Sequence, residues 1–172
     1  MCTPNTHVLI RSATPDDALA IARVRAEAVV HEAFYSGAID VNHEIEYFLP
    51  RASGYIKGEY HPSHALQERA VYVAYHQTNI IGFIAGHRTT RMECTGELQW
   101  LFVLPEWQRR GIAAQLLAHL SDWFASMQAT RVIVDSPPGN PTRAFYIKHG
   151  AQALDEHWLH WPNITSITQS AD

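Results

Sequence analysis

The chain has few of the features that mark a disulfide-rich, membrane-spanning or nucleic-acid-binding protein. Its 172 residues include two cysteines, Cys2 and Cys94, which are too few and too far apart for a disulfide framework. No apolar run reaches the roughly 18 residues that would suggest a membrane-spanning helix. There is no basic run, and the net charge is −4, so binding to nucleic acid through released counterions is not expected.

The N-terminus also lacks the positive segment and long apolar segment of a secretory signal. We therefore expect a cytoplasmic protein without a membrane partner. With 47% hydrophobic residues, a chain of this length can build one sizeable core, so one domain over residues 1–172 is expected. The 11 histidines include the closely spaced pair His61 and His64. Pro62 between them disfavours a helix that would place both imidazoles on one face, and no nearby cysteine supplies further ligands. We therefore expect no metal site.

The residues around Gly111 are the most informative in the chain. Residues 98–104, apolar except for Gln99, predict a strand, and a polar loop joins them to a pattern with helical spacing. That pattern consists of Ile112, Leu116, Leu117, Leu120, Phe124 and Met127. The first N–H groups of a helix lack intrahelical partners and lie at its positive end. Gly111 and Ala113 leave the backbone accessible, and Arg109 and Arg110 add charge, so the segment predicts a phosphate cradle.

Two better-known phosphate motifs do not fit this loop. It lacks the Gly-Lys-Ser/Thr ending of the P-loop, and it lacks the three glycines of the dinucleotide fingerprint. An ordinary strand-to-helix turn that happens to hold a glycine remains open as an alternative on this segment alone. The pattern that is present is Gln108-x-x-Gly111-x-Ala113.

A second segment, residues 140–150, has the local signals of a short helix. Asn140 is a suitable N-cap, and Pro141 fits the first helical position. Gly150 suits the left-handed residue after the helix end, where Lys148 and His149 lie near the negative terminus.

Together, the two segments resemble the signatures of the GNAT superfamily of acetyl-CoA-dependent N-acetyltransferases. The resemblance covers about residues 70–150. It implies one α/β domain with a mixed, largely antiparallel central sheet flanked by helices. Acceptor-side helices are expected over about residues 14–69, and an acetyl-CoA-binding core over about residues 70–150. Two departures stand out: Pro141 directly follows the asparagine, and Ala151 stands where the family often has an aromatic residue.

The local pattern along the chain agrees with this fold class. Alternation and apolar runs predict strands over residues 8–11, 70–76, 80–87, 97–103, 131–135, 151–154 and 157–161. Thr14, Pro15 and Asp17 predict a helix start. A short helix is expected around residues 42–48, and the Ser-, Thr- and Gln-rich tail from Pro162 is expected to be loosely held.

The resemblance also assigns roles in acyl transfer from a thioester to an amine. Glu97 stands six residues before Val103, the spacing of the family's glutamate base, and Tyr146 stands four residues before Gly150, as the family's general acid does. The backbone N–H of Val103 would polarise the thioester carbonyl. The expected cofactor-binding residues are Leu101, Phe102, Val103, Gln108, Arg109, Arg110, Gly111, Ile112, Ala113, Ala114, Asn140 and Tyr146. The alternatives for the two side chains are a solvated carboxylate at a strand end and a core aromatic.

The acceptor is less specified. Residues 31–69 are acidic on balance, with six acids, Glu32, Asp40, Glu44, Glu46, Glu59 and Glu68, against three bases, Arg51, Lys57 and Arg69. Aromatic residues in the same span are Tyr35, Tyr47, Phe48, Tyr55 and Tyr60. Such a lining would suit a cationic small-molecule or peptide amine, and a solvated helix surface is the alternative.

Two functions remain open from the sequence. One is an N-acetyltransferase with acetyl-CoA as co-substrate, and the other is a non-catalytic acyl-CoA-binding sensor. The presence of both Glu97 and Tyr146 favours the enzyme, since a sensor needs neither a base nor an acid. A sheet edge near the C-terminus allows a homodimer.

Overall fold

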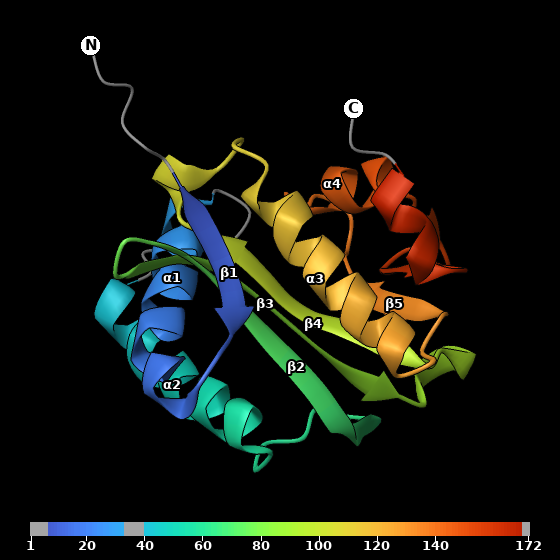
Figure 1. The fold of residues 1–172 in the computed structure, drawn as a ribbon, viewed down its shortest axis with the longest axis horizontal. Coiled ribbons are helices and arrows are strands. Elements are labelled where there is room, and N and C mark those ends of the chain that lie inside the picture. The colour runs from blue at the N-terminus through green and yellow to red at the C-terminus, as the bar shows by residue number, and fades with distance from the viewer. Residues whose placement is uncertain (1–6, 33–39, 170–172) are drawn as a thin grey trace.

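The computed structural model describes residues 7–32 and 40–169 and places them in one layered α/β unit (Figure 1). The strands are β1 (Val8–Ser12), β2 (Ala65–His76), β3 (Asn79–Thr89), β4 (Gly96–Val103), β5 (Val132–Asp135), β6 (Gln152–Ala153) and β7 (Trp158–Trp161). The helices are α1 (Ala18–His31), α2 (Val41–Lys57), α3 (Ile112–Ser126) and α4 (Arg143–Lys148), with short 3-10 helices at Pro15–Asp17, Arg91–Glu93, Pro105–Trp107 and Ile164–Gln169. The expected fold class is therefore confirmed.

The strands form a seven-stranded sheet in the order β1-β2-β3-β4-β5-β7-β6 within the described residues. Every neighbouring pair is antiparallel except β4 and β5, which run parallel. The helix α3 connects these two parallel strands, as a crossover between parallel neighbours requires. The predicted mixed, largely antiparallel sheet is thus what the chain forms.

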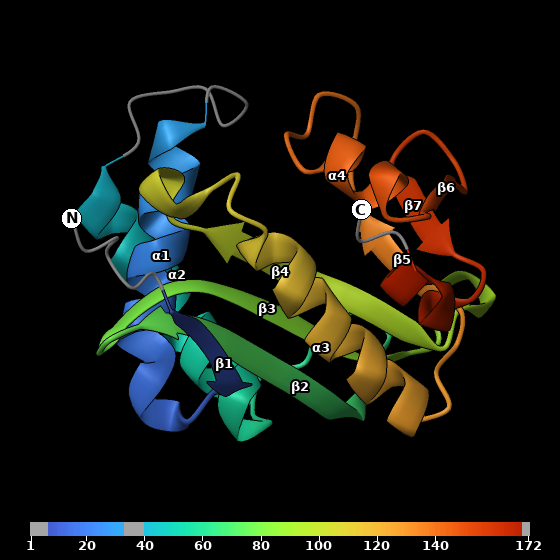
Figure 2. The same ribbon diagram turned by 45° about the horizontal axis from the view of Figure 1, so that its top comes forward.

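Helices cover both faces of the sheet (Figure 2). On one face, α1 and α2 pack against Val73 and Phe83, with Trp100 and Phe102 beside them. On the other face, α3 packs through its apolar stripe on a cluster that includes Leu98, Leu101 and Val103. The strand β4 contributes to both clusters and so lies at the centre of the molecule.

A bulge in β4 changes which face its side chains occupy. Ala85 of β3 pairs with Trp100, but the next residue, Gly86, pairs with Leu98, so Gln99 is the extra residue. Leu98 before the bulge and Leu101 after it therefore share the α3 face, although strict alternation would separate them. The bulge lies at the point where β4 begins to separate from β5.

The helix α2 is much longer than the expected residues 42–48. It continues through Pro50 to Lys57 and ends at Gly58, whose φ of 76° is left-handed. Pro50 inside a helix costs about 3 kcal/mol or more, but Phe48, Ala52 and the buried Tyr55 pack on the sheet and compensate for it. The expected early end of this helix was wrong because tertiary packing overrode the proline signal.

The expectation of a loosely held tail was also wrong for the described part. Ile164 and Ile167 are only 1% and 5% exposed and join the cluster under α3. The backbone N–H of Ile164 donates to Thr130 O at 2.8 Å, and the buried Ser121 hydroxyl donates to Ile164 O at 3.0 Å. Two apolar residues in a polar tail are thus enough to close the core at this end.

Candidate active site

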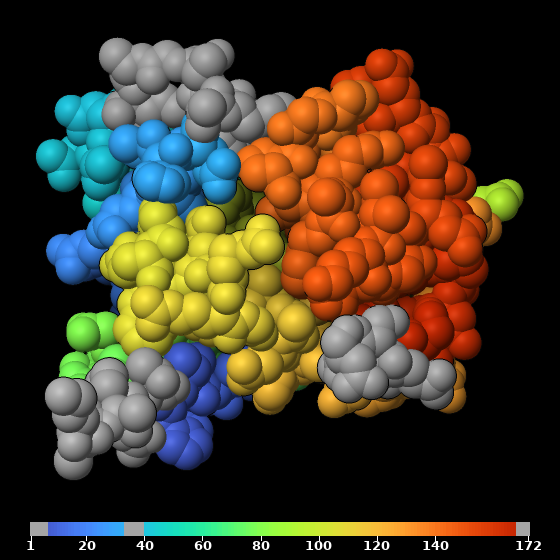
Figure 3. Space-filling model, turned by 90° about the horizontal axis from the view of Figure 1, so that it is seen from above, coloured from blue at the N-terminus to red at the C-terminus, as the bar shows by residue number. Residues whose placement is uncertain are grey.

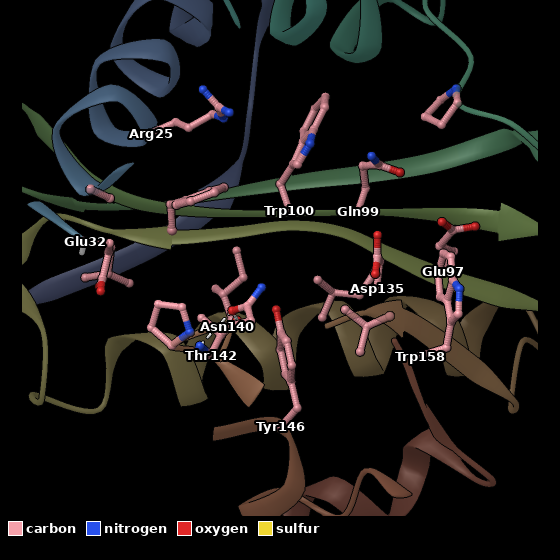
Figure 4. Close-up of a pocket in the computed structure, with 18 of the residues that line it drawn as sticks. Arg25, Glu32, Glu97, Gln99, Trp100, Asp135, Asn140, Thr142, Tyr146 and Trp158 are labelled. Carbon is pink, nitrogen blue, oxygen red and sulfur yellow. Dashed lines mark hydrogen bonds between the residues drawn. The ribbon is translucent and has the colours of Figure 1, made fainter. Parts of the chain in front are cut away.

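A cavity of about 570 Å³ opens between β4 and β5. The space-filling view shows the surface hollowed between the β4–α3 segment and the residues around α4 (Figure 3). The residues that line the cavity on β4 run from Glu97 to Val103, and those on the far side include Val134, Asp135, Asn140, Thr142 and Tyr146. Arg25, Ala28 and Glu32 of the α1 region, with Pro62, Arg91 and Trp158, complete the wall (Figure 4).

The cavity exists because two parallel strands pair over only three residues. Gly96, Glu97 and Leu98 of β4 pair with Val132 to Val134 of β5, and no pairing continues beyond them. Asp135, the last residue of β5, pairs only with β7, and the part of β4 after Leu98 pairs only with β3. The backbone of β4 after the bulge therefore faces an opening instead of a neighbouring strand.

The free backbone groups of β4 can be assigned from the hydrogen bonds at its end. The Leu104 N–H donates to Ile81 O at 2.8 Å, toward β3. In an antiparallel strand, the backbone N–H and C=O groups of successive residues point alternately to the two sides of the strand. Those of Val103 therefore point away from β3, into the opening. The Gln108 side chain supports this direction, because its Nε2 donates to Val103 O at 3.0 Å. The predicted Val103 donor thus faces the cavity, and Gln108 braces the strand end.

The loop after β4 has the geometry of an anion cradle. Arg109 and Gly111 have left-handed φ angles of 63° and 76°, which turn the chain sharply into α3. The first intrahelical bond runs from Gln115 N to Gly111 O, so the N–H groups before Gln115 have no acceptor within the helix. The first turn of α3 carries no acid that would compete for an anion.

The expected cofactor-binding residues fall into two neighbouring groups. Leu101, Phe102, Val103, Gln108, Asn140 and Tyr146 line the cavity, and so does the expected base Glu97. Arg109, Arg110, Gly111, Ile112, Ala113 and Ala114 do not line it but form the loop and helix start that follow Gln108. The Arg110 guanidinium lies 4.9 Å from the centre of the Trp107 ring, which stacks it beside the loop.

Tyr146 is held firmly on α4. Its side chain is 3% exposed and meets the Trp161 ring edge to face, with centroids 5.6 Å apart at 84°. The buried Trp161 is fixed in turn, since its indole N–H donates to His149 O at 2.9 Å. In Figure 4 the Tyr146 hydroxyl points from α4 toward β4, into the cavity.

Asn140 lies two residues before the helix cap. The helix α4 begins at Arg143, with Thr142 as its cap, so the expected N-cap position of Asn140 was wrong. The Asn140 side-chain oxygen instead accepts from the Thr142 N–H at 2.9 Å and from the Thr142 hydroxyl at 2.7 Å. The expected left-handed Gly150 is confirmed, with φ of 94°. Asn140 thereby shapes the turn that brings Tyr146 to the cavity.

Glu97 is a buried, hydrogen-bonded carboxylate. It is 5% exposed, and its Oε2 accepts from the Thr89 hydroxyl and from Arg91 Nε, both at 3.1 Å. The His87 Nε2 lies 3.5 Å from the same oxygen, and His87 Nδ1 lies 2.9 Å from the Tyr55 hydroxyl. Burial raises the pKa of Glu97, but the His87 contact and the charges of His87 and Arg91 outweigh it, so the pKa is lowered.

Asp135 is a second carboxylate on the cavity wall, and the sequence did not single it out. It is exposed to the cavity, and among the described residues its side chain makes no hydrogen bond or ion pair. Partial burial between the walls raises its pKa, and the nearby Glu97 and Asp155 add to this while His157 and Arg91 oppose it. No local signal marked Asp135, because its position depends on where β5 leaves β4.

The segment 31–69 contributes less to the cavity than expected. Of its residues, only Glu32 and Pro62 line the cavity within the described chain, and Tyr35 lies outside the described residues. Phe48 and Tyr55 are core residues that support the wall from behind, with ring centroids 4.7 and 4.9 Å from that of Trp100. Trp100 and Trp158 supply the aromatic surface that the sequence assigned to this segment.

The described part of the chain shows neither a metal-binding cluster nor a membrane-spanning helix. No three His, Cys, Asp or Glu side chains there lie close enough together to hold a metal ion. His61 instead meets Arg69, with Nδ1 2.7 Å from a guanidinium nitrogen. None of the described helices has the length and apolar character needed to cross a membrane.

Comparisons with known proteins agree with this geometry. The sequence model of the Acetyltransferase (GNAT) family matches residues 40–151, which is more than half of the chain. No curated protein matches the sequence.

Solved structures share the fold at low sequence identity. The PaiA N-acetyltransferase of Thermoplasma acidophilum in complex with coenzyme A has a TM-score of 0.70 and 15% identity, over 90% of this chain and 97% of that one. A GNAT-family acetyltransferase of Staphylococcus aureus Mu50 has a TM-score of 0.67 and 14% identity, over 92% and 99%. A GNAT-family acetyltransferase of Brucella melitensis in complex with acetyl-CoA has a TM-score of 0.59 and 22% identity, over 91% and 88%.

Proposed function

Since the chain belongs to the acetyltransferase (GNAT) family, we propose that its cavity moves an acetyl group from acetyl-CoA to a primary amine by direct attack. Enzymes of this family are acetyl-CoA-dependent acyltransferases, and the chain is an N-acetyltransferase of that kind. The acceptor and the residues that act on it are the proposal. We assign the acceptor side to about residues 14–69 and the acetyl-CoA side to about residues 70–150.

The loop and helix start after Gln108 suit the diphosphate of acetyl-CoA. Free N–H groups at the start of α3, a left-handed Gly111 and the absence of an acid in the first turn all favour a bound anion. The structure of the T. acidophilum relative with coenzyme A and that of the B. melitensis relative with acetyl-CoA share this fold. We assign the diphosphate to the backbone of Gln108 to Ala114, with Arg109 and Arg110 contributing through exposed charge.

The thioester end then lies in the opening beside β4. The Val103 N–H points there and is available to hold the carbonyl oxygen, which becomes negative during attack. Leu101 and Phe102 form the adjoining wall, and Asn140 shapes the opposite one. We assign Tyr146 as the general acid, because its hydroxyl points into the cavity and a phenol O–H can donate its proton to the leaving thiolate.

The charges around the cavity favour an acceptor that arrives as an ammonium ion. Arg25 is paired with Glu44 at 2.6 Å, and Arg91 is paired with Glu97 at 3.1 Å. Among the described residues that line the cavity, this leaves the carboxylates of Glu32 and Asp135 without a cationic partner. Together with the Trp100 and Trp158 surfaces, two uncompensated carboxylates attract a cation.

One observation carries this proposal: β4 presents an unpaired backbone to a cavity that joins an anion cradle to a tyrosine hydroxyl. Thiol release from acetyl-CoA tests it against five amines, namely a peptide with a free N-terminus, a lysine-side-chain peptide, putrescine, an amino acid and an aminoglycoside. We expect at least one amine to give amine-dependent thiol release. Tight acetyl-CoA binding without turnover for any amine would instead indicate the acyl-CoA sensor.

A further inference from the structure

Two carboxylates, Glu97 and Asp135, line the cavity and differ in their surroundings. Figure 4 shows Asp135 between Gln99 and Tyr146, with its carboxylate and the Tyr146 hydroxyl directed toward the same space beside β4. Glu97 lies farther along the cavity, where Arg91 contacts both Glu97 and Trp158. Acetyl transfer to an ammonium ion requires one group that removes a proton from nitrogen.

We propose that Asp135, rather than Glu97, takes the proton from the acceptor ammonium, and that Glu97 is a positioning residue. This inference rests on the proposed function, because a base is needed only if the cavity acetylates an amine. It assigns a catalytic role to a β5 residue for which neither the sequence patterns nor the family resemblance gave a role.

The position of Asp135 in the sheet is the first support. Val134 is the last β5 residue paired with β4, so Asp135 is the first to stand where the two strands have parted. Its backbone is anchored on the other side by pairing with Trp158 of β7. The side chain thus has a fixed origin and faces the opening, with no partner among the described residues that a substrate would have to displace.

The contacts of Glu97 are the second support. One of its oxygens already accepts hydrogen bonds from Thr89 and Arg91 and lies 3.5 Å from His87 Nε2. Protonation of this carboxylate would weaken the ion pair with Arg91, whose guanidinium carbon lies 4.8 Å from the Trp158 ring centre and whose Nη2 donates to Ser63 O at 3.0 Å. Glu97 therefore suits the task of fixing Arg91 and Trp158 on the cavity wall.

Partial burial raises the pKa of Asp135, and the charged groups that face it act in both directions. They are Glu97 on β4, Arg91 before β4, Asp155 and His157 before β7, and Tyr146 on α4 lies across the cavity. Partial burial, with Glu97 and Asp155, raises the pKa of Asp135, whereas that of Glu97 is lowered. A carboxylate with a raised pKa is the stronger base, so proton transfer from the ammonium costs less at Asp135.

Acetyl transfer from a thioester to an ammonium ion releases one proton in total. Asp135 takes one proton from the ammonium, and the free amine forms a C–N bond to the thioester carbon while the Val103 N–H holds the carbonyl oxygen. The C–S bond then breaks, and Tyr146 gives its phenolic proton to the sulfur. The second nitrogen proton returns to the Tyr146 oxygen, and Asp135 releases its proton to water. The sum is amide, thiol and one proton.

The test compares the Asp135→Asn, Glu97→Gln and Glu156→Gln variants with the wild type, using the fastest amine of the five-member panel. Glu156 is exposed in the turn between β6 and β7, so its variant removes one carboxylate without altering the cavity wall. We expect Asp135→Asn to lower kcat/KM on the order of 10²-fold near pH 7, with acetyl-CoA affinity by calorimetry unchanged. Glu156→Gln should behave like the wild type.

The pH profile separates a base from a structural residue. The wild type should be flat above the raised pKa of Asp135, because an ionised Asp135 supplies free amine from the bound ammonium. In Asp135→Asn only amine that is already free can react, so kcat/KM should rise about tenfold per pH unit up to an amine pKa of roughly 10. Glu97→Gln should lower the melting temperature and reduce kcat/KM by a factor that does not vary with pH.

Three results would overturn the inference. The first is wild-type kinetics in Asp135→Asn, and the second is a constant ratio of wild-type to Asp135→Asn rates across the pH range. The third is the rising profile in Glu97→Gln, which would make Glu97 the base as the sequence predicted. In each of these the wild type still releases thiol, so the proposed function stands. Absence of thiol release in the wild type would reject the function and this inference together.

Discussion

Three carboxylates of the chain show how neighbouring groups decide what an acid does. The two guanidinium nitrogens of Arg11 lie 2.7 and 3.0 Å from the Asp17 oxygens, and this hydrogen bonding lowers the pKa of Asp17. Glu97 is also held in its ionised form. A lowered pKa in the folded state gives stability that is present above the unfolded pKa and is lost as pH falls through the folded one. Asp135 has a raised pKa, so its charge adds no such stability and is available for catalysis.

At the residue scale the first prediction concerns Tyr146. Replacing it with phenylalanine keeps the ring against Trp161 and removes only the hydroxyl. If this hydroxyl protonates the thiolate, kcat should fall on the order of 10²-fold with little change in acetyl-CoA affinity. Tyr72→Phe, outside the cavity lining, is the matched control and should keep wild-type kcat in the thiol-release assay. Wild-type turnover in Tyr146→Phe would mean that water or another group protonates the thiolate.

The sequence could name some site residues and not others for a physical reason. Gln108, Gly111 and Tyr146 lie in short segments whose local spacing carries a signal. Asp135 has no such signal, since it becomes a cavity residue only through the parting of β4 and β5. The contacts of Glu97 with Thr89, Arg91 and His87 depend on side-chain packing that one sequence does not reveal.

At the scale of elements, the loop before α3 is the part that the sequence predicted best. The helix start and the apolar stripe appear where the pattern placed them, and the structure adds that Gly111 is left-handed. Gly111→Glu should abolish detectable acetyl-CoA binding by calorimetry. A carboxylate would stand where the diphosphate is proposed to bind, and the residue would also be forced into a left-handed backbone. Unchanged affinity would contradict the proposed cradle.

Gly58 provides a closely matched control for this change. It has the same φ of 76° as Gly111, and a side chain added at either position would meet no atom within 4 Å. Gly58→Glu should therefore bring a similar backbone strain, of about 1–2 kcal/mol, while acetyl-CoA affinity stays at the wild-type value. A comparable loss of affinity in both variants would show that strain, and not the anion site, explains the Gly111 result.

The elements predicted less well are those set by long-range packing. Strand β2 begins at Ala65, five residues before the expected Ala70. Ala65 pairs with Thr89 at the end of β3, which is also longer than expected. Gly54 and Pro50 each predict the end of a helix from the local sequence, yet α2 continues through both. A side chain at Gly54 would come within 3.0 Å of the Tyr60 Cβ, so this glycine serves a close approach after the helix end rather than a turn.

At the scale of the whole molecule, the site lies where two packed halves meet. The cluster under α1 and α2 supports Trp100 and Phe102 from one side of β4, and the cluster around α3 supports Leu101 and Val103 from the other. The two clusters thus hold the β4 wall of the cavity from both faces of the sheet. The sheet order leaves β1 and β6 at the two edges, and a homodimer through the C-terminal edge stays a prediction.

The C-terminal tail gives the last prediction. Ile164 is 1% exposed within the α3 cluster, so Ile164→Ala should lower the free energy of unfolding by about 2–5 kcal/mol, measured by urea denaturation. The matched control is Ile147→Ala, since Ile147 is 51% exposed and the same substitution there removes little buried surface. A loosely held tail would give equal, small effects for the two variants. The buried Ser121 hydroxyl also bonds to Ile164 O, so a repacked tail would loosen α3 toward its C-terminal half. The anion cradle lies at the opposite end of that helix, and acetyl-CoA affinity in Ile164→Ala should therefore remain near the wild-type value while stability falls.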